Sequence, residues 1–296
     1  MSETRCGYIA IVGRPNVGKS TLLNRILGVK LSITSRKPQT TRHRLLGIKT
    51  VDQTQWVYVD TPGLHRGEKK ALNKHLNRAA KSALQDVDVL LWLVEANRLT
   101  EDDEWILKLL STVSVPVILV VNKIDHCIPK ERLLPFLSEL SEKRQFAAIV
   151  PIAARLGEQV SVLEDTIAGY LPHAPFFFAE SELTDRSTAF LITERVREKL
   201  MRQLGQEVPY ELTVTLEALE TTEKLVKASA IIWVDKDSQK PMVIGEGGAR
   251  LKRVGQEARL ELETLLGVKL FLKLWVKVKS GWFDNEQSLR QMGYEE

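Results

Sequence analysis

Eight residues near the start of the chain, GRPNVGKS at positions 13–20, have the types and spacing of a phosphate-binding loop. They satisfy G-x-x-x-x-G-K-[ST], with a strand-like run before them and a helix-like segment after them, as the motif requires. The glycines let the backbone wrap phosphates, so that amide groups and a helix N-terminus face negative charge. Lys19 is expected to reach the β- and γ-phosphates, and the Ser20 hydroxyl to bind Mg²⁺. The residues expected to contact a nucleotide here are Gly13, Arg14, Pro15, Asn16, Val17, Gly18, Lys19, Ser20 and Thr21.

A second motif, DTPG at positions 60–63, ends the apolar run QWVYVD. Asp60 is expected to hold the Mg²⁺ ion through its water shell, and the Gly63 amide to meet the γ-phosphate. Between the two motifs, ITSRKPQTTRHR at positions 33–44 is a polar loop, which we expect to cover the nucleotide and to act as a switch. Its arginines are interpreted as solvated. Thr41, in preference to Thr40, is expected to reach Mg²⁺ when the γ-phosphate is bound. The residues expected to support phosphoryl transfer are Lys19, Thr41, Asp60 and Gly63, with Thr61 and Pro62 as further contacts.

A third motif, NKID at positions 122–125, selects guanine over adenine. The Asp125 carboxylate can accept both N1–H and the exocyclic N2–H of guanine, a pair of donors that adenine does not offer. Asn122 is expected to brace the loop and the Lys123 stem to cover the base. In the later loop PIAARLG, Ala153 and Ala154 are expected to offer a backbone N–H to the guanine O6. The order of the three motifs predicts a nucleotide site for GTP or GDP with Mg²⁺.

The segments that must position these loops alternate between strand-like and helix-like patterns up to about residue 171. The strand-like runs are apolar and rich in Val and Ile, as strands covered on both faces are: YIAIVG, QWVYVD, DVLLWLVE, VPVILVVN and AAIVPI. The helix-like segments include NKHLNRAAKSALQ at 73–85 and EDDEWILKLLS at 101–111. This alternation predicts an α/β domain, a mostly parallel sheet with helices on both faces. RHRLLGIKT and QWVYVD are expected to form an antiparallel hairpin at one edge.

A second domain is predicted after the stretch LPHAPFFFAESELTD at 171–185, where prolines, aromatic residues and acids indicate a linker. A helix over 187–204, two alternating strands, a glycine cluster, a second helix and the strand KLFLKLWVKV predict an α+β domain. Trp233, Phe271 and Trp275 alternate with polar residues and are interpreted as core residues. The predicted boundaries are 1–172 for the first domain, 173–184 for the linker and 185–296 for the second domain.

The glycine cluster VIGEGGARLK at 243–252 is open to three interpretations: another nucleotide site, a nucleic-acid clamp or a tight turn. No Lys-Ser or Lys-Thr follows the glycines, which disfavours a nucleotide site. Residues 244–279 carry eight basic residues and four acids, so a basic face is expected in a chain whose net charge is only +4. Near the end of the chain, Lys277, Lys279 and Trp282 combine charge and an aromatic ring beside a glycine, which favours RNA contact.

The remaining composition excludes several classes of protein. The chain has 296 residues, 44% of them hydrophobic, and this is enough for two ordinary folded domains. The two cysteines are too few for a disulfide framework or a cysteine zinc site. No apolar run approaches the ~18 residues of a membrane-spanning helix, and no secretory signal is visible at the start. The sequence therefore predicts a cytoplasmic protein.

The stretches GRPNVGKST, QTTR, DTPGLH, NKID, VIGEGGARLK and WVKVKSGW together resemble the Era-type bacterial GTPases, and the resemblance covers essentially the whole chain. It implies a GTPase domain followed by a type II KH domain. It also implies a monomer that binds 16S ribosomal RNA near its 3′ end and assists assembly of the small (30S) ribosomal subunit. A peripheral association with the inner face of the cell membrane is implied as well.

The same resemblance identifies VIGEGGARLK as the GxxG element of a KH domain, where a loop clamps a single-stranded RNA backbone beside an apolar groove. The RNA-contacting residues expected in this element are Gly245, Glu246, Gly247, Gly248, Arg250, Lys252 and Arg253. By analogy with the family, Asn16 is expected to coordinate a K⁺ ion that supplies positive charge.

Three residues stand out against this pattern. Glu246 stands where a basic residue is common in the family, and Ala153 stands where a serine is usual. Leu64, as in the family, replaces the glutamine that aligns water in Ras-like enzymes, and leucine cannot orient a nucleophile. We therefore expect slow intrinsic GTP hydrolysis that rises when RNA or the ribosomal subunit orders the 33–44 loop. Two other interpretations stay open: an RNA-binding scaffold in which nucleotide is structural, and a GTPase partner of an RNA-modifying enzyme.

Overall fold

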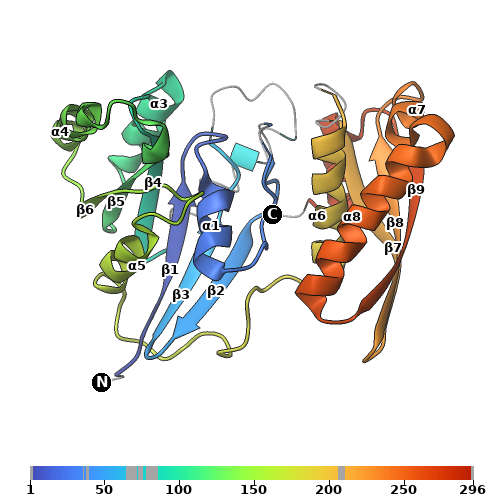
Figure 1. The fold of residues 1–296 in the computed structure, drawn as a ribbon, viewed down its shortest axis with the longest axis horizontal. Coiled ribbons are helices and arrows are strands. Elements are labelled where there is room, and N and C mark those ends of the chain that lie inside the picture. The colour runs from blue at the N-terminus through green and yellow to red at the C-terminus, as the bar shows by residue number, and fades with distance from the viewer. Residues whose placement is uncertain are drawn as a thin grey trace. The chain divides into compact units, whose positions relative to one another are not determined.

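The computed structural model describes residues 3–35, 37, 40–64, 72, 76–77, 86–205 and 211–294. The chain forms two compact units, which divide between Asp185 and Arg186. Figure 1 shows the helices and strands of each unit. The helix expected over 73–85 lies almost wholly outside the described residues. No helix in the described part of the chain is both long enough and apolar enough to cross a membrane.

The first unit is built on a six-stranded sheet with strand order β2-β3-β1-β4-β5-β6. Its strands are β1 (Arg5–Val12), β2 (Leu45–Val51), β3 (Thr54–Asp60), β4 (Val89–Glu95), β5 (Val117–Asn122) and β6 (Ala148–Pro151). All neighbouring pairs are parallel except β2 and β3, which form an antiparallel hairpin at one edge. The predicted α/β sheet with an edge hairpin is therefore confirmed.

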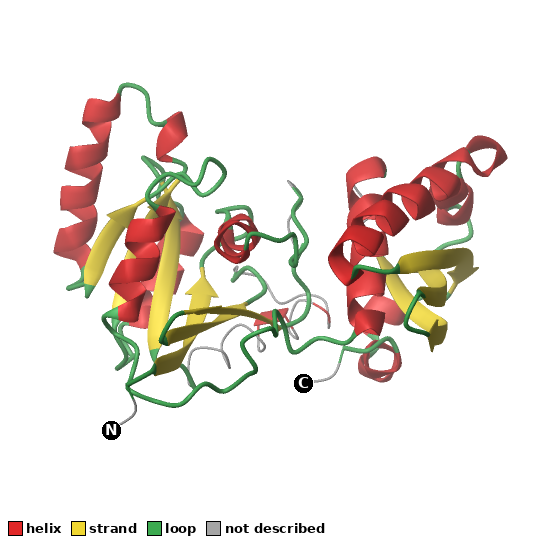
Figure 2. Cartoon of the chain, turned by 60° about the horizontal axis from the view of Figure 1, so that its bottom comes forward, coloured by secondary structure: helices red, strands yellow, loops and turns green. Residues whose placement is uncertain are grey.

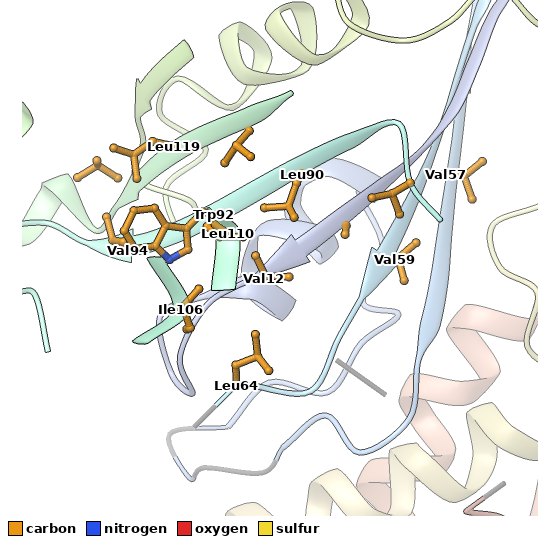
Figure 3. Close-up of a cluster of buried hydrophobic side chains, with 14 of the residues drawn as sticks. Val12, Val57, Val59, Leu64, Leu90, Trp92, Val94, Ile106, Leu110 and Leu119 are labelled. Carbon is orange, nitrogen blue, oxygen red and sulfur yellow. The ribbon is translucent and has the colours of Figure 1, made fainter. Parts of the chain in front are cut away.

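Helices cover both faces of this sheet. They are α1 (Lys19–Leu27), α3 (Glu101–Leu110), α4 (Leu133–Lys143) and α5 (Val160–Ala168). Figure 3 shows the core on the α3 side, where Trp92 of β4 lies beside Ile106 and Leu110 of α3. The strands supply alternate residues to this core because successive side chains of a strand point to opposite faces. On the other face α1 and α5 contact each other.

The parallel arrangement places the predicted nucleotide motifs together, at the carboxyl ends of the strands. β1 runs into the phosphate loop, β3 into DTPG, β5 into NKID and β6 into the loop that contains Ala153 and Ala154. Since these four strands are parallel, their carboxyl ends lie at the same edge, which is where open α/β sheets bind ligands.

The segment predicted as a linker is fastened to the first unit. The buried Gln55 side chain accepts the N–H groups of Phe177 and Phe178 at 2.9 and 3.0 Å and donates to the Phe178 carbonyl at 2.9 Å. Further along, the Leu183 carbonyl accepts the N–H of Ile48 at 2.9 Å. The aromatic residues of this stretch predicted partial packing against a domain. The structure adds hydrogen bonds between the backbone of the stretch and the first unit.

The second unit packs two long helices on one face of a three-stranded sheet, as Figures 1 and 2 show. Its strands are β7 (Leu212–Thr221), β8 (Leu225–Val234) and β9 (Lys269–Val278), in the order β7-β8-β9, with β7 antiparallel and β9 parallel to β8. The helices α6 (Thr188–Gln203) and α8 (Ala249–Leu266) supply Val196, Leu200, Val254 and Ala258 to the core beneath the sheet. This is the predicted α+β order.

Three features of the second unit differ from the sequence prediction. Two short helices, α7 (Gln239–Ile244) and α9 (Glu286–Gln291), were not expected. Phe271 and Trp275, interpreted as core residues, are 51% and 54% exposed. They belong to the alternate set of β9 residues that faces away from α6 and α8, while Leu270 and Val276 of the other set are buried. Trp233 is only partly buried.

Candidate nucleotide and RNA sites

The phosphate loop presents the open N-terminus of α1. Gly18 caps this helix in a left-handed conformation, φ 113°, and no side chain caps the first amide groups. The amides of a first helical turn have no acceptor within the helix, so they remain available to an anion. A side chain at Gly18 would also collide with Asn122, since an added Cβ would lie 2.2 Å from its Nδ2.

Lys19 lies folded back into the phosphate loop. Its Nζ donates to the carbonyl oxygens of Gly13 at 2.9 Å and Arg14 at 3.0 Å. Burial, together with the Arg14 charge, lowers the pKa of Lys19 to about 8, against the opposing effect of Asp60. A phosphate anion held in the loop would favour the charged ammonium form.

Ser20, Thr41 and Asp60 converge although they come from three separate segments. The Ser20 and Thr41 hydroxyl oxygens are 3.1 Å apart, and they lie 3.2 and 3.4 Å from Asp60 Oδ2. Ser32, which the sequence did not suggest, donates to the same oxygen at 2.6 Å. Thr40 instead donates to the Lys37 carbonyl at 2.6 Å. The structure thus brings Thr41, and not Thr40, to the predicted metal ligands.

This cluster has the donor chemistry of a Mg²⁺ site. Burial raises the pKa of Asp60 above its ordinary value. Hydrogen bonds from Ser32, Ser20 and Thr41 and the charge of Lys19 act in the opposite direction but do not cancel the rise. Its second oxygen, Oδ1, is buried and has no hydrogen-bond partner in the described chain. Within the described ranges, no three or more His, Cys, Asp or Glu residues lie close enough together to hold a metal ion by themselves. Two hydroxyls and one carboxylate therefore fit Mg²⁺, which is usually shared between one or two carboxylates and substrate phosphates.

The DTPG segment lies close against the phosphate loop. An added Cβ at Gly63 would lie 2.9 Å from Pro15, so only glycine permits this approach. Thr61 is buried and donates to the Ile11 carbonyl at 2.9 Å, so its hydroxyl serves the fold. Leu64 is 1% exposed and packs in the core shown in Figure 3. Its side chain therefore lies away from any water that could attack a phosphate.

Asn122 ties the guanine motif to the phosphate loop. Its Nδ2 donates to the Val17 carbonyl at 2.8 Å, and its Oδ1 accepts the N–H of Ala154 at 3.0 Å. The N–H of Ala153 donates to Glu158 at 3.2 Å. Both alanine amides are thus already used, which differs from the expectation that they face the guanine O6. An O6 contact through either alanine would require its N–H to be shared between two oxygens.

Lys123 and Asp125 are the second and fourth residues of the NKID motif. Lys123 adopts a left-handed conformation, φ 63°, and its Nζ lies 3.2 Å from Glu95. One oxygen of Asp125 lies 3.3 Å from His126 Nε2, and the Asp125 side chain is 19% exposed. The carboxylate is therefore reachable by a ligand.

A pocket joins several of the predicted residues with others that the motifs missed. It is lined by Pro15, Asn16, Gly18, Lys19, Ser20, Thr21, Ile33, Thr34, Ser35, Lys37, Thr40, Thr41 and Gly63. Four of the lining residues belong to no motif: Ile33, Thr34, Ser35 and Lys37. Only their place in the 33–44 loop could have predicted that they line the pocket. Arg42 of that loop is fully buried, which contradicts its interpretation as a solvated arginine.

The glycine cluster of the second unit forms a tight turn between two helices. Gly245 and Gly248 have φ values of 76° and 78°, a region that favours glycine. At Gly245 an added Cβ would also lie 2.7 Å from the Arg250 side chain, whereas Gly248 has open space. Arg250 donates from Nη1 to the Met242 carbonyl, so this arginine braces the turn. Glu246 and Gly247 are exposed at its tip.

Beside this turn runs a groove between α8 and the edge strand β9. It is lined by Gly248, Leu251, Lys252, Gly255, Gln256, Arg259, Leu270, Phe271, Leu272 and Leu274. Leucines on the strand side and cations on the helix side suit bases and phosphates, respectively. Gly255, Gln256, Arg259 and Phe271 were missed by the motif, although helical spacing from Lys252 could have suggested Gln256 and Arg259.

The remaining residues predicted to contact RNA are placed differently. Trp282 is fully buried, donates to the Glu211 carbonyl at 3.0 Å and stacks on Tyr294, so the expectation that it contacts RNA is wrong. Arg253 pairs with Glu257 at 2.8 Å and does not line the groove. Lys277 pairs with Glu217 at 3.2 Å, and Lys279 donates to Gln291 at 2.8 Å. Neither of these two lysines lines the groove.

Comparisons with known proteins agree with this division into two sites. The family model described as "50S ribosome-binding GTPase" matches residues 8–123, and the model described as "KH domain" matches residues 207–283. "GTPase Era" of Coxiella burnetii (strain Dugway 5J108-111) is 52% identical over 296 residues, covering 100% of both chains. "GTPase Era" of Pseudomonas fluorescens (strain Pf0-1) is 52% identical, over 99% of this chain and 98% of its own.

Two solved structures are similar over almost the whole chain. One is Era in complex with MgGDPNP and nucleotides 1506–1542 of 16S ribosomal RNA, with a TM-score of 0.95 and 38% identity. The other is a variant of Aquifex aeolicus Era bound to GDP and AlF4⁻, with the same score and identity. Each covers 99% of this chain and 100% of its own.

Proposed function

This chain belongs to the Era family of GTPases, and from that premise we propose that it is a GTP-hydrolysing switch that binds 16S ribosomal RNA near its 3′ end and assists assembly of the small ribosomal subunit. The observation that supports a switch is that Thr41 lies beside Ser20 and Asp60. Thr41 belongs to the loop that lines the pocket, so a metal ion bound there would contact that loop. A threonine that reaches the metal only with GTP links the loop's conformation to the bound nucleotide.

GTP hydrolysis in this site depends on positioning and charge. Water attacks the γ-phosphorus, the bond to the β–γ bridging oxygen breaks, GDP leaves with the electron pair, and the protons of the water pass to the inorganic phosphate and the solvent. Lys19 and the α1 amides would stabilise the negative charge on the phosphates, and a Mg²⁺ ion held by Ser20, Thr41 and Asp60 would supply further positive charge when bound. Leu64 is buried in the core, so it cannot orient the water. We therefore expect slow hydrolysis until RNA orders the covering loop.

RNA binding is supported by the groove beside the Gly245–Gly248 turn. The related Era structure contains a 16S rRNA fragment, nucleotides 1506–1542. In this chain the turn leads directly into α8, and the groove offers Lys252 and Arg259 beside the apolar residues of β9. A GxxG loop of this kind clamps about four nucleotides of a single strand.

The proposal is tested by the binding of single-stranded RNA that matches the 3′ end of 16S rRNA. Protein loaded with a non-hydrolysable GTP analogue, loaded with GDP and free of nucleotide would be compared. We expect the GTP form to bind best, and Gly248→Asp to abolish binding in every form. Equal binding in all three forms would remove the switch and favour a scaffold in which nucleotide is structural. If GTP hydrolysis is seen only when a separate RNA-modifying enzyme is added, the protein would instead be a GTPase partner of that enzyme.

The location of the protein is proposed from the family resemblance alone. We expect it to be a monomer in the cytoplasm, with peripheral attachment to the inner face of the membrane. Fractionation of cells with and without high-salt washing would separate a peripheral fraction from a purely cytoplasmic one.

A further inference from the structure

The face of the second unit's sheet that points away from α6 and α8 carries alternating cations and aromatic rings. We call it the outer face. Along β9 its residues are Lys269, Phe271, Lys273, Trp275 and Lys277. In the register of β8, Lys227 lies opposite Phe271, Ile231 opposite Trp275 and Trp233 opposite Lys277. The outer face is therefore a continuous surface across two strands.

The two β9 rings of the outer face are unusually open to solvent. Phe271 and Trp275 remain 51% and 54% exposed, whereas Ile231, which lies opposite Trp275 on β8, is 6% exposed. Trp233 is held by its Nε1–H, which donates to Thr215 Oγ1 at 2.9 Å. The ammonium of Lys273 lies 5.5 Å from the Phe271 ring centre, within the range of a cation–π contact. Trp275 thus keeps about half of its surface open to solvent.

The outer face continues from the RNA groove. Phe271 lines the groove together with Gly248 and Lys252, and it also belongs to the outward residues of β9. Because β9 is the edge strand of the described sheet, no further strand separates the groove from the outer face. A strand of RNA that leaves the groove across this edge would meet Phe271 first and Trp275 next.

We propose that the outer face extends the RNA site: single-stranded RNA held in the groove crosses the edge of β9 and stacks further bases on Phe271 and Trp275. The inference rests on the proposed RNA-binding function. Phe271 and Trp275 are four residues apart on one strand, about 13 Å at the usual rise, so they would meet different bases. Lys269 and Lys273 alternate with the rings and would face the phosphates between the bases.

The composition of the outer face favours RNA over a second protein copy. Aromatic rings interleaved with cations are the surface on which proteins bind single strands without reading every base. Lysine is depleted in the buried centre of protein interfaces, whereas this face carries Lys227, Lys269, Lys273 and Lys277. Among the described residues, three of these four lysines have an acidic partner: Glu217 lies 3.2 Å from Lys277, Glu220 lies 3.4 Å from Lys227 and Glu263 lies 3.7 Å from Lys269.

The test compares two RNAs from the same 3′-terminal sequence, a tetranucleotide and a twelve-nucleotide strand that extends it in both directions. Wild type, Trp275→Ala and Trp275→Phe would be titrated at fixed salt. We expect Trp275→Ala to bind the longer RNA about tenfold more weakly, with unchanged affinity for the tetranucleotide. Trp275→Phe, which keeps a ring, should recover most of the loss. Leu260→Ala is the matched control, since Leu260 is 50% exposed on α8 of the same unit.

A charge variant provides a second measurement. Lys273→Glu should also weaken the longer RNA selectively, and the loss should be greatest at low salt. One outcome is that the tetranucleotide binds and both variants bind the longer RNA as tightly as wild type does. The proposed extension over the outer face would then be wrong, and the RNA site in the groove would be retained. If neither RNA binds to wild type, the extension and the proposed RNA function both fail. A change of molecular mass in light scattering with unchanged RNA affinity would instead assign the face to contact between copies, and would also overturn the proposal.

Discussion

The carboxylate of Glu95 binds the guanidinium of Arg14, with the nitrogen and oxygen 2.5 Å apart. Glu95 ends β4, and its other oxygen lies 3.2 Å from Lys123 Nζ in the guanine motif. Arg14 is held on its second side by Asp103 at 3.1 Å, within the capping box of α3. One carboxylate therefore connects the phosphate loop to the residue expected to cover the base, and the Arg14 guanidinium is held between acids of β4 and α3.

Glu95→Gln should lower the affinity for GDP about tenfold, because an uncharged amide holds Arg14 and Lys123 more weakly. Unfolding should become easier by about 2 kcal/mol, the size of a charged hydrogen bond. Fluorescent-nucleotide titration and urea unfolding would measure the two effects. Glu104→Gln, an exposed acid of α3, is the control. Unchanged nucleotide affinity in Glu95→Gln would show that the bridge serves the fold alone.

The same bridge predicts a pH dependence of stability. Burial alone would raise the pKa of Glu95, but Arg14 and Lys123 outweigh it and hold the pKa below the ordinary glutamate value of 4.5. The folded protein thus keeps the carboxylate ionised where the unfolded chain begins to bind a proton. This contribution is complete above about pH 4.5 and is lost as the pH falls below that value. Urea unfolding from pH 6 to pH 3.5 should show a shallower loss for Glu95→Gln, and parallel curves would contradict the assignment.

Asp125→Asn should exchange guanine for xanthine. A carboxylate at this position can accept two guanine N–H groups, whereas the amide of asparagine can donate to the xanthine oxygen at position 2 and still accept N1–H. We expect GDP affinity to fall at least 100-fold and XDP affinity to rise. Competition between the two nucleotides measures this directly. A variant that loses both equally would indicate that Asp125 holds the turn and does not read the base.

Glu246→Lys should strengthen RNA binding. Glu246 is exposed at the tip of the glycine turn, where its charge would repel the phosphate backbone of a bound RNA. If the new lysine contacts one phosphate, the slope of log affinity against log salt should steepen by about 0.7, the value for a single strand. Glu223→Lys, in the turn between β7 and β8, makes the same charge change away from the groove. Equal gains in both variants would mean that only net charge matters.

Asn16 carries the expectation of a K⁺ ion. It lies exposed in the phosphate loop with a left-handed backbone, φ 64°, and lines the nucleotide pocket. We expect hydrolysis to be faster in KCl than in NaCl, and Asn16→Ala to remove the difference. Equal rates of the wild-type protein in the two salts would refute the expectation.

Prediction from the sequence was most successful where a function is contained in a short contiguous segment. The strand that precedes each nucleotide motif fixes where its loop emerges, so parallel pairing alone brings Ser20 and Asp60 to one edge. The preference for Thr41 over Thr40 also agrees with the hydrogen bonds observed.

The sequence was least informative where the outcome depends on packing between distant elements. A period of two along β9 separates two faces but does not indicate which of them the helices cover, so the exposed rings of Phe271 and Trp275 were assigned to the core. Trp282 was misplaced because its anchor, the Glu211 carbonyl, lies 71 residues away. Ser32 and Glu95 belong to no motif, and only the folded chain places them at the site.

The alternation along β9 also bears on the solubility of the protein without RNA. β9 is an edge strand of the described sheet and exposes its backbone hydrogen-bonding groups beside two large rings, a combination that invites pairing with another chain. Lysines on an edge strand oppose such pairing by mutual repulsion. The residues proposed to attract phosphate would then also protect the free protein from aggregation.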